Sequence, residues 1–208
     1  MFEELTETLD GFIKNFGIPF YDCIVMKDGA CVYRRSNGYT EGKTAVTGKE
    51  LYNIYSCSKL ITCAAALQLY EKGLFKLDDE LCRYMPEFEN MTVADGDSVR
   101  PAKNKITIRQ LFTMTAGFSY DLYSPSLKKC REETDGKCPT REAMKYLAKE
   151  PLLFEPGYRW EYSLCHDVLA ALVGVLSGMT FGEYVKKNIF DVCGMENSAF
   201  LINDLKRL

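Results

Sequence analysis

Ser56 and Lys59 are the residues whose types and spacing best suit chemistry, within the stretch Ser56-Cys57-Ser58-Lys59. Residues three apart on a helix lie on one face, so the serine hydroxyl and the lysine amine can meet. A serine hydroxyl is a poor nucleophile at neutral pH and needs a neighbouring base to take its proton. A lysine can be that base if burial lowers the pKa of its amine. The pair therefore predicts acyl transfer at a serine without the help of histidine.

Both residues also have an ordinary structural explanation. Serine is a favoured N-cap residue of helices, and Lys59 would then be a surface charge. The same pattern recurs at Ser126-Leu127-Lys128-Lys129, which we interpret as part of a solvated loop.

The surrounding sequence favours the first copy. Ser56 opens a run that is apolar on most sides and ends at Lys72 and Gly73, as a helix does. A helix that is apolar nearly all round is a buried one. Ser56 would lie at its N-terminus, where backbone N–H groups and the helix dipole stabilise a developing negative charge.

The remaining elements divide at about residue 56. Before it, helical spacing runs from Phe2 to Phe16, and the tight-turn pair Asp28-Gly29 separates two expected strands. After it we expect a polar surface excursion at 93–105, a long polar loop at 115–139 that carries Tyr120, and mainly helix elsewhere. The expected strands are Asp22–Met26 and Ala30–Arg34, and the expected later helices are Thr107 to Met114, Thr140 to Lys149, Tyr162–Ser177 and Thr180 to Phe190.

Composition sets the broad class. The chain has 208 residues, 47% of them hydrophobic, with a net charge of −3, which suits one or two globular domains. There is no apolar run of about 18 residues and no secretion signal in the acidic N-terminal segment, so we expect a cytoplasmic protein without a membrane span. The mildly acidic balance gives no basic face for nucleic acid.

The nine cysteines are odd in number and contain no Cys-x-x-Cys motif. Reduced and partly buried thiols explain this distribution best. Cys130 and Cys138 could form a loop disulfide or bind a metal, but the nearby residues include no histidine. We therefore expect neither a metal site nor a cofactor.

Several motifs in order give the chain a resemblance to a known family. It resembles the serine hydrolases related to class C β-lactamases, D-alanyl-D-alanine peptidases and esterases, a penicillin-binding-protein-like group. The segments that carry the resemblance are Ser56-Cys57-Ser58-Lys59, Gly73 to Asp79, Ile106 to Gly117, Phe154-Glu155-Pro156-Gly157, Tyr162-Ser163, Ile189-Phe190-Asp191 and Gly194-Met195.

The resemblance implies a fold and a mechanism. The fold would be α+β, β-lactamase/transpeptidase-like, with residues 1–55 giving a helix and strands and residues 56–208 a mainly helical part with the active-site motifs. The serine would attack a carbonyl to form an acyl-enzyme, and Ser56, Lys59 and Tyr162 would be the catalytic residues. A phenol titrates near 10, so Tyr162 acts as a base only if nearby positive charge, such as that of Lys59, stabilises its anion.

The chain departs from the family pattern in the Tyr-x-Asn motif. Leu164 stands where the family has asparagine, and leucine cannot orient a substrate carbonyl by hydrogen bonding. This puts β-lactam hydrolysis in doubt and favours an esterase or peptidase relative. His166, one turn after Tyr162, either faces the same pocket or is a satisfied structural residue. Leu164, His166 and Tyr120 are the candidates for substrate binding, and Asp167 is expected to be a surface or capping carboxylate.

A second departure is the absence of the family's Lys-Thr-Gly or His-x-Gly motif after Tyr162. The resemblance implies further C-terminal strands that complete the sheet, so we expect an N-terminal portion of a larger catalytic domain with an incomplete antiparallel sheet.

The sequence leaves two functions open. The leading one is a serine hydrolase that acts through an acyl-enzyme on a small-molecule or peptide substrate containing an ester or amide. We expect its activity in this chain to be weak, because the missing strands would supply one oxyanion N–H. The alternative is a non-catalytic penicillin-binding or sensor-like protein, or an inactive fragment. Partners could be the missing C-terminal part or another copy of the chain.

Overall fold

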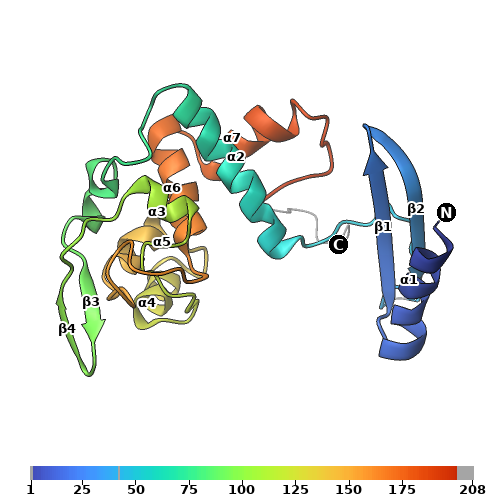
Figure 1. The fold of residues 1–208 in the computed structure, drawn as a ribbon, viewed down its shortest axis with the longest axis horizontal. Coiled ribbons are helices and arrows are strands. Elements are labelled where there is room, and N and C mark those ends of the chain that lie inside the picture. The colour runs from blue at the N-terminus through green and yellow to red at the C-terminus, as the bar shows by residue number, and fades with distance from the viewer. Residues whose placement is uncertain (1, 42, 201–208) are drawn as a thin grey trace. The chain divides into compact units, whose positions relative to one another are not determined.

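The computed structural model describes residues 2–41 and 43–200. The described chain forms two compact units, one ending at Asn53 and one beginning at Ile54, and each is described by itself. In chain order the elements are α1 (Glu3–Phe16), β1 (Phe20–Lys27), β2 (Ala30–Gly38), η1 (Tyr55–Cys57), α2 (Ser58–Glu71), η2 (Leu81–Arg83), η3 (Pro86–Phe88), β3 (Thr92–Asp95), β4 (Ser98–Pro101), α3 (Ile108–Phe112), α4 (Pro125–Glu133), α5 (Thr140–Leu147), α6 (Cys165–Ser177), α7 (Phe181–Val185) and η4 (Lys186–Phe190) (Figure 1).

The first unit is an antiparallel hairpin with one helix against it. β1 and β2 pair from Phe20 opposite Gly38 to Lys27 opposite Ala30. Asp28 and Gly29 both have a positive φ, 51° and 77°, as the expected tight turn requires. The predicted hairpin and helix are confirmed, and both strands are longer than the sequence indicated.

A polar network joins α1 to the hairpin. The carboxylate of Asp10 accepts hydrogen bonds from the Tyr21 hydroxyl at 2.6 Å, the Arg35 guanidinium at 2.8 Å and the Asn37 amide at 2.9 Å. These bonds, led by that of Tyr21, lower the pKa of Asp10 from 3.8 to about 2. Because helix and hairpin share little apolar burial, this network is the main specific link between them.

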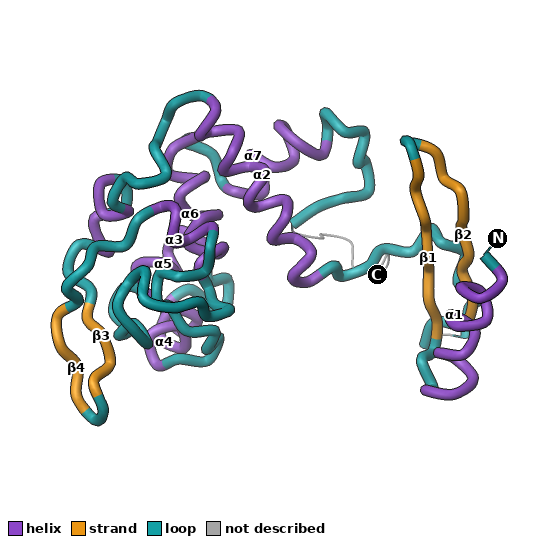
Figure 2. The backbone as a smooth tube through the Cα atoms, in the orientation of Figure 1, coloured by secondary structure: helices purple, strands orange, loops and turns teal. Residues whose placement is uncertain are grey.

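The second unit is built around α6. Eight of its residues are buried, and the helix packs against α2, α3, α5 and α7 (Figure 1). Gly178 ends α6 with a φ of 69°. Thr107 and Thr180 begin α3 and α7 in capping boxes, as the sequence predicted. In the described part of this unit the only strands are the short β3–β4 hairpin (Figure 2).

Two expected loops contain regular structure. The segment 93–105 was expected to be a polar surface excursion, but it forms most of the β3–β4 hairpin. Val93 is buried, and the backbone of its strand forms hydrogen bonds with the backbone of Leu152. The segment 115–139 was expected to be loop, but it contains α4. The start signal for α4 is Ser124 followed by Pro125: the Ser124 hydroxyl accepts a hydrogen bond from the Leu127 N–H.

In the described residues no single helix is long and apolar enough to cross a membrane. The pair Cys165–Ser177 and Phe181–Phe190 meets that test only when taken together, with a bend of 78° between its halves.

The Asp10 network predicts a pH dependence of stability. The pKa of Asp10 is lower in the folded state, so its stabilising contribution is full above 3.8 and is lost as the pH falls through about 2. Asp10→Asn should therefore lose less stability than the wild type between pH 4 and pH 2, and should be less stable at pH 6. Urea unfolding at each pH measures this. Asp28→Asn, in the hairpin turn, changes the net charge equally and should follow the wild-type curve; identical curves for all three proteins would contradict the prediction.

Candidate active site

Ser56 lies in η1, the single turn that precedes α2. It makes no N-capping hydrogen bond, so the structural explanation of this serine as a helix cap is wrong. Its side chain is exposed in the described chain. The expectation of a helix buried on nearly all sides is also wrong, because α2 buries only Thr62, Ala65, Ala66 and Leu69 and leaves Leu60 78% exposed.

Tyr162 is held by an extended segment rather than by a helix. The predicted helix start at Tyr162 is wrong, since α6 begins at Cys165. The N–H of Glu161 donates to Met114 O at 3.0 Å and the N–H of Leu164 donates to Ser119 O at 3.1 Å, so the segment around Tyr162 runs beside residues 114–119. This pairing fixes the position of the Tyr162 ring above the start of α6.

Gly117 allows the segment 114–119 to lie close to residues 152–154. Its φ is 95°, and a Cβ at this position would lie 2.4 Å from the carbonyl oxygen of Phe154. Only glycine therefore fits this part of the expected Ile106 to Gly117 motif.

The structure brings Ser56, Lys59 and Tyr162 together. The Tyr162 Oη lies 2.5 Å from the Ser56 Oγ, and the Lys59 Nζ lies 3.4 Å from the same oxygen. The Lys59 Nζ is also 5.0 Å from the centre of the Tyr162 ring. The shorter distance makes the phenol oxygen the better-placed acceptor for the serine proton.

Electrostatics assign different roles to the amine and the phenol. Burial alone would lower the pKa of Lys59, but the hydrogen bond to Tyr162 and the neighbouring Tyr120, Tyr162 and Asp167 together raise it above 10.5. The pKa of Lys59 is thus not lowered overall, so the condition under which Lys59 would be the base is not met, and its amine is protonated at neutral pH. The hydrogen bond from Ser56, followed by that from Lys59, lowers the pKa of Tyr162 from 10.0. Tyr162 therefore loses its proton more readily than an ordinary phenol, and the Lys59 ammonium contributes to this shift.

Tyr120 and Asp167 complete the surroundings of the amine. The rings of Tyr120 and Tyr162 are 5.0 Å apart at 63°, and the Lys59 Nζ is 5.5 Å from the Tyr120 ring centre. Asp167 was expected on the surface, but it is half-buried and burial raises the pKa of its carboxyl. Sequence reasoning missed its influence on Lys59; its place five residues after Tyr162, in the first turn of a buried helix, was the available signal.

Comparison with known proteins identifies the family. The family model described as Beta-lactamase matches residues 8–206. The chain belongs to the β-lactamase family.

Its relatives in this family include esterases. The lovastatin esterase of Penicillium rubens is 31% identical over 194 residues, 86% of this chain and 47% of the relative. Esterase EstB of Burkholderia gladioli is 31% identical over 192 residues, 88% of this chain and 47% of the relative. The chain therefore spans about half the length of these relatives.

A solved structure extends the likeness to the fold. EstCE1, described as a hydrolase with promiscuous acyltransferase activity, is 25% identical to this chain in sequence. The two structures superpose with a TM-score of 0.82, and the match covers 99% of this chain and 55% of EstCE1. The α+β fold expected for a β-lactamase-family chain is confirmed by this match.

Leu164 and His166 are both buried. Leu164, at the family's asparagine position, is 3% exposed and packs in the core. His166 is buried, with Nε2 3.3 Å from the carbonyl oxygen of Phe112, so Nε2 carries the hydrogen; the Cys63 Sγ lies 3.7 Å from the same nitrogen. Burial lowers the pKa of His166, which keeps the imidazole neutral. A substrate-binding role for either residue stays a prediction.

The second Ser-x-x-Lys copy lies on α4 rather than in a solvated loop. Ser126 is the second residue of that helix, and its N–H donates to the Glu150 carboxylate at 2.8 Å. Lys129 forms an ion pair with Glu133 along the helix at 3.6 Å. The amine of this copy is therefore paired with a carboxylate, which also accepts a hydrogen bond from the Tyr146 hydroxyl.

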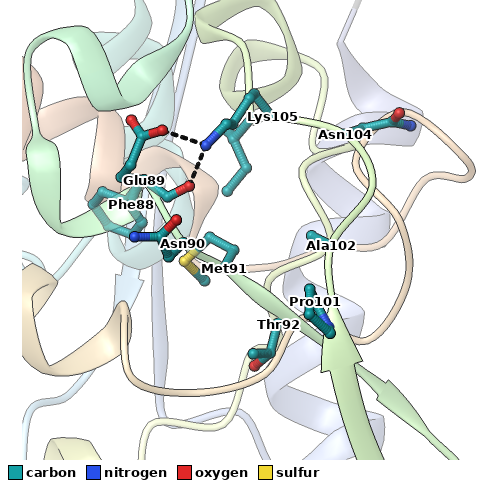
Figure 3. Close-up of a pocket in the computed structure, with 10 residues that line it drawn as sticks. Phe88, Glu89, Asn90, Met91, Thr92, Pro101, Ala102, Asn104 and Lys105 are labelled. Carbon is teal, nitrogen blue, oxygen red and sulfur yellow. Dashed lines mark hydrogen bonds and ion pairs between the residues drawn. The ribbon is translucent and has the colours of Figure 1, made fainter.

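A separate cavity of about 370 Å³ lies between the segments 88–92 and 101–106 (Figure 3). Lys105 spans its rim, where the Nζ binds both the backbone oxygen and the carboxylate of Glu89. Ser56, Lys59 and Tyr162 are not among its lining residues, so this cavity is separate from their cluster.

Tyr55 sits before the nucleophile in a strained conformation. Its φ is 44°, in the left-handed region of backbone conformation that a bulky residue rarely adopts. Its side chain is 82% exposed. Tyr55→Gly should be more stable than Tyr55→Ala by about 1 kcal/mol, because glycine removes the strain while both variants lose the same side chain. Urea midpoints of the two variants measure this difference. An alanine variant at least as stable as the glycine variant would show that the backbone is not strained here.

Proposed function

We propose that Ser56 is the nucleophile of an acyl-transfer enzyme, with Tyr162 as its base and Lys59 as the cation that keeps Tyr162 reactive. The observation that supports this proposal most directly is the 2.5 Å distance between the Tyr162 Oη and the Ser56 Oγ. The Lys59 Nζ lies 3.4 Å from the same serine oxygen. A serine beside a hydrogen-bonded base that is itself oriented by a third group is the arrangement that nucleophilic catalysis requires.

In this mechanism Tyr162 accepts and returns each proton. The Tyr162 phenolate takes the proton of the Ser56 hydroxyl as the serine oxygen attacks the substrate carbonyl. The same phenol then gives that proton to the leaving group, so the acyl group remains on Ser56 and Tyr162 is again an anion. Tyr162 then takes a proton from water, and the resulting hydroxide attacks the acyl carbonyl. The bond to Ser56 breaks, the acid leaves, and Tyr162 returns the proton to the Ser56 oxygen. Lys59 stays protonated throughout, which agrees with the raised pKa of its amine.

Esters are the substrate class that the relatives favour. The relatives at 31% identity are a lovastatin esterase and Esterase EstB. Leu164 also favours an ester substrate, because a buried leucine cannot supply the amide hydrogen bond that the family's asparagine offers. We propose a small-molecule ester as the substrate; an alcohol in place of water would make the same acyl-enzyme a transferase.

A second candidate is a protein that is acylated at Ser56 but does not release the acyl group. The same Leu164 favours it, since the residue at that position cannot orient the acyl carbonyl. Release of p-nitrophenol from p-nitrophenyl acetate separates the candidates: continued turnover supports the esterase, whereas one equivalent without turnover supports the acylated binding protein.

Covalent labelling tests the identity of the nucleophile. A fluorescent fluorophosphonate should label the wild-type chain, and Ser56→Ala should lose the label because the attacking oxygen is gone. Ser126→Ala is the matched control, since it alters the other Ser-x-x-Lys copy, and it should label like the wild type. Equal labelling of wild type and Ser56→Ala would exclude Ser56 from the mechanism.

The role of Tyr162 predicts the rate and pH dependence of this labelling. Tyr162→Phe should slow it by about 10²–10⁴-fold, the usual contribution of a general base. In the wild type the rate should increase as the pH rises through a pKa below 10, since the deprotonated phenol is the active form. The variant should lose that dependence. Tyr123→Phe, on the same loop as Tyr120, serves as the control and should change neither the rate nor the profile.

A further inference from the structure

Cys130 and Cys138 bring two thiols into contact away from the catalytic group. Cys130 is on α4 and Cys138 is in the loop before α5, and their sulfur atoms are 3.0 Å apart. All nine cysteines are free thiols. Within the described chain this is the only hydrogen bond between two cysteine sulfurs, so the pair is distinct from the other seven.

The backbone between the two cysteines holds them in place. The Thr134 hydroxyl donates to Cys130 O at 2.7 Å and accepts from the Cys138 N–H at 2.9 Å. The Gly136 N–H donates to Arg131 O at 2.8 Å, with a φ of 77° at the glycine. These bonds turn the chain back onto the last turn of α4. A disulfide requires two side chains that already approach closely, and this turn supplies that approach.

The two thiols differ in access. Cys130 is fully buried, and burial together with Cys138 raises the pKa of its thiol to about 11. Cys138 is half-buried and lines an open groove of about 710 Å³, whose other walls come from α6 and α7. A reagent from solution can therefore reach Cys138 but not Cys130.

We propose that Cys130 and Cys138 form a reversible disulfide by exchange with a small disulfide of the oxidised glutathione class. The Cys138 thiolate attacks one sulfur of that disulfide, which forms a mixed disulfide and releases one glutathione thiolate. The Cys130 sulfur then attacks the Cys138 sulfur, loses its proton to solvent and releases the second glutathione. Both protein thiols are oxidised and one oxidised glutathione is reduced to two thiols, so the electrons balance.

The bond would stabilise the part of the fold that leads to Tyr120. Arg131, next to Cys130, donates a hydrogen bond to Leu122 O and lies 5.4 Å from the centre of the Tyr123 ring. α4 thus holds the loop that carries Tyr120. Closing the loop between residues 130 and 138 removes conformations from the unfolded chain and should raise the Tm by roughly 5 °C.

Peptide mapping of the native chain tests the proposal. The protein is treated with oxidised glutathione, its remaining thiols are alkylated, and it is digested with trypsin without reduction. Trypsin cuts after Lys129, Arg131, Lys137 and Arg141, so the expected product is the dipeptide Cys130-Arg131 linked to Cys138-Pro139-Thr140-Arg141. Dithiothreitol should remove the linked product and reverse the rise in Tm.

Single variants test the order of the two steps. Cys130→Ser should stop at the mixed disulfide, with one glutathionyl group on Cys138, because no second thiol follows. Cys138→Ser should leave Cys130 reduced, because that thiol is buried. Cys57→Ser, which changes an exposed cysteine, should still give the linked product. A wild-type map in which Cys138 keeps its glutathione, or in which Cys130 pairs with another cysteine, would overturn the proposal even if a variant fails to fold.

Discussion

The hydrogen bond between Ser56 and Tyr162 is the contact on which the site depends. It joins residues 106 positions apart, and its 2.5 Å length brings the two oxygens close enough for direct proton transfer. Neither oxygen is reactive by itself at neutral pH, because both groups hold their protons. The hydrogen bond from Ser56 and the Lys59 ammonium both favour the phenolate, which is what the proposed nucleophile and base require.

The rest of the second unit serves to keep that contact. Lys59 is fixed because α2 packs on α6, and Tyr162 is fixed because its segment hydrogen-bonds to residues 114–119 immediately before α6 begins. Gly117 allows this segment to approach the chain near Phe154. α6 therefore positions Lys59 through the packing of α2 and Tyr162 through the loop that enters α6.

The sequence predicted the parts of this arrangement that depend on local chemistry. The Ser56–Lys59 spacing, the Asp28-Gly29 turn and the capping boxes at Thr107 and Thr180 are local signals, and the structure contains each of them. The sequence failed where a distant contact decides. The start of α6 was placed too early, because Tyr162 pairs with another segment. The upward pKa shift of Lys59 could not be foreseen, because the aromatic and acidic neighbours that cause it come from elsewhere in the chain. α4 was missed although Ser124-Pro125 signals its start, because the surrounding residues are polar.

The pKa of Tyr162 itself is the most direct test of the account. Protein labelled with ¹³C at the tyrosine Cζ gives one NMR signal for each ring, and Tyr162→Phe identifies the signal of Tyr162. The account predicts that this signal titrates with a pKa below 10 in the wild type and at a higher pKa in Lys59→Met, because the stabilising charge has been removed. A Tyr162 pKa at or above 10 that does not respond to Lys59→Met would contradict the central claim.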